Sequence, residues 1–244
     1  MKLTNDHVNP LSMERIVPDD LLSDETTGAE TLRFHLERYQ FARQYLVQGS
    51  VLDIACGVGY GTALLAEHPE VTKALGVDIS SASVQYALQR YNGDRVSYIC
   101  SDALQFCPEQ QFENIVSLET IEHVDDPRAL FSHLVSLLAP GGRLITSIPV
   151  TPSVDANPHH KTNFSTKTFM QMGEEFSLNY VASLNQVQPF SPVAVGMKSE
   201  ARTSGLRRNL GLFYLHNPSH LFLRVWSVLR DGFANKYLTI VWEK

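Results

Sequence analysis

The alternation of short apolar runs with helix-like segments constrains this fold more than any other feature of the sequence. Five runs are predicted to be buried strands: Ser50–Ala55, Val71–Val77, Val96–Cys100, Asn114–Leu118 and Arg143–Ile148. Helices are predicted before and between them at Ala29–Val47, Gly61–Ala66, Ser81–Tyr91 and Pro127–Leu138, the last ended by Pro140, Gly141 and Gly142. Strands that alternate with helices in this way predict a parallel, doubly wound α/β sheet.

The pattern loosens after Pro149. A helix is predicted at Ser165–Met172, followed by strands at Leu178–Val187 and Tyr237–Trp242. Between these strands lies another helix, Pro218–Leu229, with proline at its first position and Gly232 beyond its end. Its apolar residues Leu221, Val225 and Val228 share a face, which predicts a packing helix. A lid or a dimerisation element is the alternative that the sequence leaves open.

A glycine turn, Gly57-Val58-Gly59-Tyr60-Gly61, links the first predicted strand to the helix after it. Such turns bind nucleotide-like ligands in open α/β sheets, because glycine lets the backbone approach the ligand and the helix N-terminus offers free N–H groups. Asp78 ends the second strand, where a carboxylate can accept both ribose hydroxyls. Asp102 follows the third strand, from which its side chain can reach an adenine edge.

Two residues argue against a nicotinamide dinucleotide as the ligand of this turn. Thr62 stands where the dinucleotide fingerprint has its third glycine. Asp53 lies inside the preceding strand, where a carboxylate suits a positively charged ligand better than a pyrophosphate. S-adenosylmethionine carries both an ammonium and a sulfonium group, and it satisfies this requirement.

Five successive motifs resemble those of the class I S-adenosylmethionine-dependent methyltransferases. They are VLDIACGVGYG, GVDIS, SDALQF, IVSLETIEHV and LLAPGGRLITSIP, and the resemblance covers roughly residues 30–187. The upstream segment HLERYQFARQYL resembles the N-terminal helix of a subgroup associated with small-molecule or glycan modification. The resemblance implies a Rossmann-like, mostly parallel sheet of seven strands, with YLTIVWEK as its antiparallel last strand.

The same resemblance divides the chain into four parts. Residues 1–48 are expected to form an N-terminal helical segment or lid, although the polar first 30 residues are expected to be irregular. Residues 49–187 are expected to form the S-adenosylmethionine-binding core. Residues 188–235 are expected to be an insertion that caps the acceptor site, and residues 236–244 to be the last strand.

The resemblance also assigns cofactor contacts to matching positions. The expected contacts are Asp53, Gly57 and Gly59 at the methionine portion, Asp78 at the ribose, Ile79, Asp102 and Ala103 at the adenine, and Glu119 near the transferable methyl group. Tyr39 and Arg38 of the N-terminal helix are expected to close over the cofactor. The sequence leaves open the alternative of a packed aromatic ring beside a solvated guanidinium group.

The expected reaction is methylation of a hydroxyl group of a small molecule or sugar. Because methyl transfer is an in-line displacement with a neutral leaving group, the enzyme mainly aligns the acceptor and removes its proton. His123 is expected to be the base, Glu119 to lie near the methyl group and His160 to orient the acceptor. The alternatives are an N-methyltransferase acting on a small heterocycle or amine, in which the histidines serve binding, and a cofactor-binding protein without turnover.

We expect no metal at this site, with a metal-dependent O-methyltransferase as a further alternative. Glu119, Glu122 and His123 follow one strand, and His159 and His160 follow the next, so all five lie at the same edge of the sheet. This pattern resembles the metal site of the small-RNA 3′-end 2′-O-methyltransferases, although NPHHKTNF matches theirs only in part.

Composition restricts the partners. A formal net charge of −6 and a sequence pI of about 5.8 disfavour a nucleic-acid partner. Apolar runs are too short to span a bilayer and the N-terminus lacks a signal-peptide apolar region, so we expect a cytoplasmic protein with no membrane partner. The three cysteines form no CxxC pair, which favours a reducing compartment. The expected partner is a small-molecule acceptor, and the oligomeric state stays open.

Overall fold

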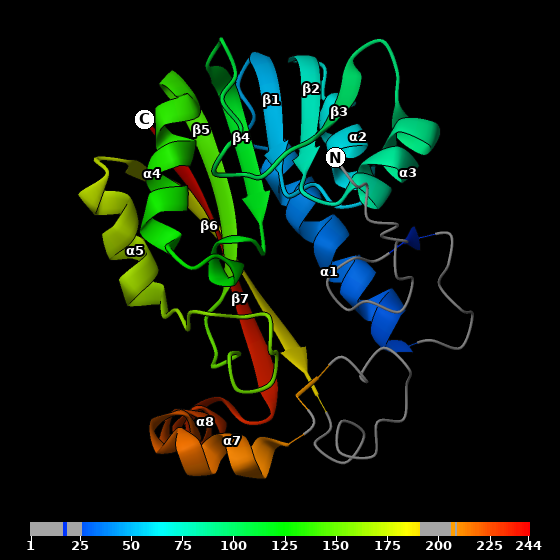
Figure 1. Ribbon diagram of the computed structural model, residues 1–244. Coiled ribbons are helices and arrows are strands. Elements are labelled where there is room, and N and C mark those ends of the chain that lie inside the picture. The colour runs from blue at the N-terminus through cyan, green and yellow to red at the C-terminus, as the bar shows by residue number, and fades with distance from the viewer. Residues whose placement is uncertain (1–16, 19–25, 191–205, 208) are drawn as a thin grey trace.

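The computed structural model describes residues 17–18, 26–190, 206–207 and 209–244. Its centre is a seven-stranded sheet in the order β3-β2-β1-β4-β5-β7-β6 (Figure 1). The strands are β1 (Gly49–Ile54), β2 (Val71–Asp78), β3 (Val96–Cys100), β4 (Phe112–Leu118), β5 (Leu138–Pro149), β6 (Asn179–Pro189) and β7 (Ala234–Glu243). The predicted α/β class and the predicted number of strands are confirmed.

The direction of the strands also agrees with the prediction. Neighbours from β3 to β5 pair in parallel, whereas β7 runs antiparallel to both β5 and β6. The chain winds outward from β1 in one direction and from β4 in the other. The carboxyl ends of these two central strands therefore border the crevice in which open α/β sheets bind their ligands.

Helices cover both faces of the sheet. They are α1 (Thr26–Arg43), α2 (Tyr60–Ala66), α3 (Ser81–Tyr91), α4 (Pro127–Leu137), α5 (Thr166–Glu175), α7 (Leu210–His216) and α8 (Pro218–Asp231). Figure 1 shows α1, α2 and α3 on one side of the sheet and α4 and α5 on the other. Side-chain caps begin several of them: Ser80 accepts a hydrogen bond from Ser83 N, and Asp126 accepts one from Ala129 N.

The main core lies between the sheet and the layer of α4 and α5. Trp242 of β7 is fully buried there, with its ring 6.4 Å from that of Phe131 and 6.3 Å from that of Phe169. A second cluster on the other face joins α1 and α2 to the sheet through Ala42, Leu65 and their neighbours. The two clusters pack both faces of the central strands and so fix the positions of their carboxyl ends.

The structure corrects the prediction around β5. This strand begins at Leu138, directly after α4, so the proline and two glycines lie within it and do not separate the helix from a later strand. Gly141 N donates to the carbonyl of Lys244 and Gly142 O accepts from Lys244 N. These two hydrogen bonds to Lys244 pair Gly141 and Gly142 with the residue after β7, so both glycines belong to the sheet. The short 3₁₀ helix η2 (Ile121–His123) and helix α7 were not predicted.

The packing role predicted for α8 is wrong. Ser227 is its one buried residue, and Leu221 and Val225 of the expected packing face are exposed. In Figure 1 the hairpin of α7 and α8 lies beyond the end of the sheet, apart from both helical layers. Within the described residues, no helix combines the length and apolarity that crossing a membrane requires.

Candidate active site

The turn after β1 is strained at Ala55, which the periodicity predicted as the last residue of the strand and which instead follows β1. Ala55 has a φ of 61°, in the left-handed region, and it is followed by Gly57 at 56° and Gly59 at 88°. The left-handed positions therefore recur at every second residue, beginning with an alanine. Ala55, Cys56, Gly57 and Val58 line the cleft at this end of the sheet. An alanine side chain does not favour a left-handed φ, so the sequence gives no signal for this position.

Asp53 lies behind this turn and is fully buried. Thr62 Oγ1 donates to its Oδ2 at 2.6 Å, and the Tyr39 hydroxyl lies 3.3 Å from both carboxylate oxygens. Burial raises the pKa of Asp53 to about 7, although these hydrogen bonds partly oppose the shift and Asp78 adds to it. A cationic group bound at the turn would favour the ionised carboxylate.

Helix α1 supplies the other wall of the cleft through His35, Arg38 and Tyr39. The Tyr39 ring packs so closely over Gly61 that a Cβ at this glycine would lie 1.9 Å from a ring carbon. Arg38 is buried with its guanidinium 4.6 Å from the centre of the Tyr237 ring, so it is not a solvated arginine. Both α1 residues therefore line the cleft, and Tyr39 is also the packed aromatic ring of the alternative; closure over a cofactor stays a prediction.

The carboxyl ends of β2 and β3 continue the same edge. Asp78 Oδ2 accepts from Gly57 N at 2.9 Å, and its Oδ1 accepts from Ser80 N at 2.9 Å. These bonds fix the carboxylate beside the glycine turn. Ile79 is exposed, as an adenine-packing residue must be before the ligand binds, and Asp102 accepts from Leu104 N.

Two of the predicted cofactor residues, Ala103 and Gly59, have further structural contacts. Ala103 packs partly buried against the main core. Gly59 does not line the cleft, because it faces Ala87 and Tyr98, whose side-chain atoms leave no room for a Cβ. Gly59 thus lets α2 approach the neighbouring elements, which is a packing role in addition to its place in the turn.

Glu119 follows β4 at the other border of the crevice. Its φ of 49° is left-handed, which is uncommon for a side chain of this size and typical of functional positions. Ser147 Oγ donates to its Oε1 at 2.8 Å, and Arg38 Nη2 lies 4.0 Å from the same oxygen. The carboxylate is therefore held inside the cleft between β5 and α1.

Two histidines meet beside the chain segment that follows Glu119. The rings of His123 in η2 and His160 in the loop after β5 meet edge to face, with their centroids 4.5 Å apart. The loop is held there because Lys161 N donates to the carbonyl of Glu122 at 2.8 Å. Burial lowers the pKa of His160 to about 3, with His123 and His159 adding to the shift, so its imidazole is neutral at physiological pH.

A fully buried carboxylate completes this group. Glu122 Oε1 lies 3.9 Å from His123 Nε2, and one ligand atom from each of Glu122, His123 and His160 falls within 4.8 Å of the others. Glu119 and His159 do not belong to this group among the described residues, although the sequence placed all five at one edge. This spacing allows the three side chains to ligate one divalent ion, and the Glu122 carboxylate lies close enough to stabilise a protonated His123.

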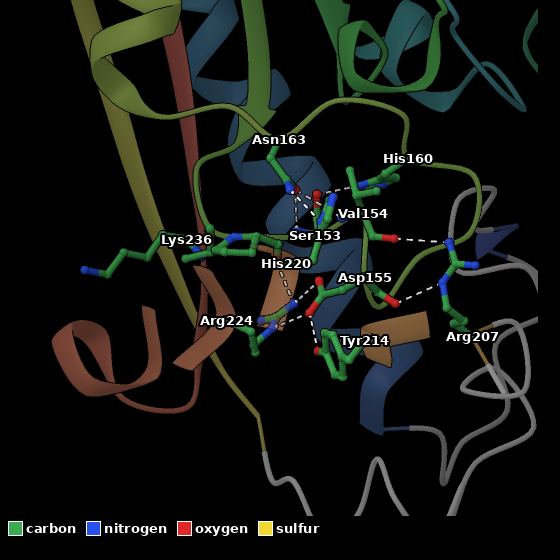
Figure 2. A network of polar contacts seen from close by, with 12 residues as sticks. Ser153, Val154, Asp155, His160, Asn163, Arg207, Tyr214, His220, Arg224 and Lys236 are labelled. Atoms are coloured by element: carbon green, nitrogen blue, oxygen red, sulfur yellow. Dashed lines mark hydrogen bonds and ion pairs between the residues drawn. The ribbon is translucent and has the colours of Figure 1, made fainter. Parts of the chain in front are cut away.

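A polar network joins the histidine loop to the α7–α8 hairpin (Figure 2). Asp155 is buried, and both its oxygens accept from Arg224, at 2.6 and 2.7 Å, while Tyr214 donates to Oδ2 at 2.6 Å. Burial alone would raise the pKa of Asp155, but the hydrogen bonds from Arg224 and Tyr214 outweigh it and hold the pKa below its usual range. In the same loop, Ser153 Oγ bonds to His160 Nδ1 at 2.7 Å.

Known proteins share parts of this sequence. Residues 52–146 match the family model described as a methyltransferase domain. Phosphoethanolamine N-methyltransferase 1 of Arabidopsis thaliana is 31% identical over 159 residues, which cover 62% of this chain and 31% of that protein. Malonyl-[acyl-carrier protein] O-methyltransferase of Priestia megaterium is 33% identical over 98 residues, which cover 40% of this chain and 36% of that protein.

The fold has solved counterparts as well. The N-methyltransferase NodS from Bradyrhizobium japonicum WM9, in complex with S-adenosyl-L-homocysteine, matches with a TM-score of 0.58 and 20% identity, covering 91% of this chain and 90% of that chain. This likeness shows the fold. The matching methyltransferase domain and the methyltransferase relatives support a class I S-adenosylmethionine-dependent methyltransferase, with S-adenosylmethionine as its cofactor. The chain spans about a third of the length of the phosphoethanolamine relatives it matches.

Proposed function

We propose that this protein transfers the methyl group of S-adenosylmethionine to a hydroxyl group of a small molecule or sugar, with His123 as the general base. The observation that carries the proposal is the pair of imidazoles, 4.5 Å apart, in the segments that follow β4 and β5. A base close to the methyl donor is what a hydroxyl acceptor requires, because its oxygen must lose a proton as it attacks.

In this proposal some residues bind the cofactor or the acceptor, and His123 removes the acceptor's proton. Bound S-adenosylmethionine supplies an electrophilic methyl group and leaves as a neutral thioether when the acceptor oxygen takes that methyl group. His123 receives the hydroxyl proton, and the buried Glu122 carboxylate 3.9 Å away stabilises the imidazolium that forms. His160, neutral and held by Ser153, orients the acceptor. Glu119 and Arg38 border the cofactor cleft on the side of β4.

The segment between β6 and β7 supports a capping role in this proposal. Arg207 donates from its backbone to Ala156 O at 2.8 Å and from its side chain to the carbonyls of Val154 and Asp155. Asn163 Nδ2 lies 3.5 Å from His220 Nδ1. Because these contacts hold the loop that carries His160, we infer that the described part of the predicted 188–235 insertion closes the acceptor pocket; residues 191–205 and 208 of that insertion lie outside the described residues.

Methylation of an amine is the second candidate function. Names among the relatives and structural neighbours favour it, since phosphoethanolamine N-methyltransferase and NodS both methylate nitrogen by name. An amine acceptor attacks through its own lone pair and needs little base strength. His123 would then bind the acceptor without removing its proton in the transition state.

A metal-dependent O-methyltransferase is favoured by one specific observation. The ligand atoms of Glu122, His123 and His160 lie within 4.8 Å of one another, which matches the spacing of ligands around one divalent ion. One carboxylate with two imidazoles suits Mn²⁺, Fe²⁺ or Zn²⁺ better than Mg²⁺. In this case the three residues would hold the ion and position the acceptor oxygen, and His123 would be a ligand instead of a base.

Cofactor binding is tested first, by thermal unfolding with S-adenosylhomocysteine and with NAD. S-adenosylhomocysteine should raise the melting temperature progressively with its concentration, because it binds the folded state. A shift with NAD and none with S-adenosylhomocysteine would overturn the assignment of the cleft. Tight binding without methyl transfer across a broad acceptor panel would support a non-catalytic protein.

The hydroxyl and amine reactions are separated by His123→Ala, with His159→Ala as the matched control. His159 is exposed, adjacent to His160 and outside the three-residue group. For an identified acceptor, the proposal expects His123→Ala to lower kcat by about 10²–10⁴-fold, the usual contribution of a general base, while His159→Ala stays near wild type. Activity retained in His123→Ala would favour the amine reaction.

The metal alternative has its own readout. Purified protein is analysed for bound metals, then assayed with a chelator and after each divalent ion is added back. Full activity in chelator is the expected result. Activity abolished by the chelator and restored by one ion would replace the proton-transfer mechanism with metal ligation.

A further inference from the structure

We propose that the α7–α8 hairpin is a peripheral docking surface for an anionic lipid bilayer. The hairpin face is defined by six exposed side chains: Leu215, Phe222, Val225, Trp226, Leu229 and Phe233. Among the described residues, ten of the seventeen large apolar side chains that are exposed lie between Leu210 and Phe233. Such a concentration marks an interaction surface, whereas single exposed apolar residues are ordinary.

The orientation of α8 is the reverse of that of an ordinary surface helix. Leu229 is 78% exposed and Phe222 is 68% exposed, and with Val225 they form one stripe at three- and four-residue spacing. The opposite side of the helix, where Ser227 is buried and His220 and Arg224 are partly buried, faces the protein. The helix therefore presents its apolar face outward and binds the body through its polar face.

Polar contacts fix this orientation (Figure 2). Arg224 makes a two-point ion pair with the buried Asp155 and also donates to Pro152 O at 2.6 Å. Turning the apolar stripe inward would break this pair and leave Asp155 buried without its counter-ion, which is strongly unfavourable. The Asp155–Arg224 ion pair therefore fixes α8 in the orientation that exposes its apolar face.

Charge around the hairpin face selects the partner. Arg207 and Arg224 face the body, where they bind the loop that carries Asp155. Arg230 and Lys236 remain at the C-terminal end of α8, with Asp231 between them; the Arg230 side chain is 58% exposed and that of Asp231 is 6% exposed. A cavity of about 490 Å³ beside this end of α8 is lined by Lys167, Arg230 and Lys236, together with Asp231. Cations at the edge of an apolar face suit anionic headgroups.

The same observations favour a bilayer over a second copy of the chain. A symmetric dimer through this face would bring the cations of both copies to one contact. A bilayer places the apolar face at the acyl boundary and the cations at the headgroups, with the body of the protein on the aqueous side. The expectation of no membrane partner rests on run length, which addresses spanning a bilayer and not lying on its surface.

The test is sedimentation of the full chain with vesicles of phosphatidylcholine, with and without phosphatidylglycerol. Wild type should bind the vesicles that contain phosphatidylglycerol, less so at high salt and less so without the anionic lipid. The double variant Phe222→Ser/Leu229→Ser should lose binding by more than about tenfold, because two of the most exposed apolar side chains are gone. Leu88→Ser, an exposed apolar residue on α3, is the matched control and should bind as wild type.

A second measurement locates the contact and keeps a folding defect apart from it. Trp226 is exposed whereas Trp242 is buried, so a blue shift of tryptophan emission on anionic vesicles, absent in Trp226→Phe, reports insertion of the hairpin. Unchanged thermal stabilisation by S-adenosylhomocysteine shows that the double variant is folded. Absence of wild-type binding to anionic vesicles overturns the proposal. A solution dimer that the double variant dissociates, with no vesicle binding, overturns it in favour of a second copy.

Discussion

Polar groups at the end of β1 and in the α7–α8 hairpin are held by partners at very different separations along the chain. Asp53 is bound by Thr62 and Tyr39, nine and fourteen residues away, and Asp78 by Gly57, twenty-one residues away. The hairpin is held by Arg224 and Tyr214, which reach Asp155 over sixty-nine and fifty-nine residues. These contacts at the cofactor end therefore lie within one continuous stretch from α1 to β2, whereas the hairpin depends on the assembled fold.

The largest expected effect separates the two regions. Asp155→Asn leaves Arg224 partly buried without its anion, and we expect docking of the hairpin to lose about 3–5 kcal/mol. Hydrogen exchange should accelerate in α7 and α8, while the affinity for S-adenosylhomocysteine stays within about threefold, since the altered contact lies outside the β1 unit. The control Asp125→Asn breaks an ion pair with Lys161 in which Asp125 is 88% exposed, and should cost at most about 1 kcal/mol. An equal loss of cofactor affinity in Asp155→Asn would show that the regions are not separable.

The converse change is Asp78→Ala. If this carboxylate accepts the ribose hydroxyls, its removal should cost about 2–4 kcal/mol of affinity for S-adenosylhomocysteine, as expected for charge-assisted hydrogen bonds. Hairpin exchange rates should not change. Calorimetry measures the affinity, with the exposed Asp94→Ala as control. Less than about threefold weakening would contradict the ribose assignment.

The pH dependence of Asp53 sharpens the description of the cofactor end. Its pKa is about 7 in the folded chain, above the ordinary 3.8, so the folded cofactor-free state binds the extra proton between these values. The stability that this carboxyl contributes is thus present at acid pH and lost as pH rises to about 7. Binding of a cationic ligand needs the ionised form, so affinity should move the opposite way and weaken by up to about tenfold per pH unit below 7. Titration calorimetry across pH measures this, and Asp53→Asn should flatten the profile. An unchanged profile in that variant would assign the proton to another group.

The smallest expected effect concerns backbone strain in the glycine turn. Ala55 has a φ of 61°, so Ala55→Gly should relieve left-handed strain and stabilise the chain by about 0.5–1 kcal/mol, after the entropy cost of glycine. Gly57→Ala, two residues on at 56°, should destabilise by a similar amount. Chemical denaturation measures both. Changes of the same sign would show that contacts, and not φ, control stability at this turn.

The site shows where sequence reasoning reaches its limit. Asp78 and Glu119 were placed at strand ends because apolar runs end at or just before them, and Asp53 was placed inside the first strand; the structure has all three at these positions. That His123 and His160 both lie at this edge was also predictable from strand order. Their contact at 4.5 Å was not, because it depends on a loop held by the carbonyl of Glu122 and by Ser153. Ala55 was missed because its side chain does not disclose its φ.

The sequence by itself determined the order of strands and helices, the parallel sheet and the glycine turn, because hydrophobic period and turn chemistry act over a few residues. It also predicted an apolar face on α8, formed by Leu221, Val225 and Val228. Only the tertiary structure decided that the stripe of Phe222, Val225 and Leu229 faces outward while Val228 is half-buried, since the periodicity of a helix is the same whichever face meets the body. The deciding interaction is the ion pair of Asp155 with Arg224, a contact between segments that are distant in sequence and adjacent only after the sheet has formed.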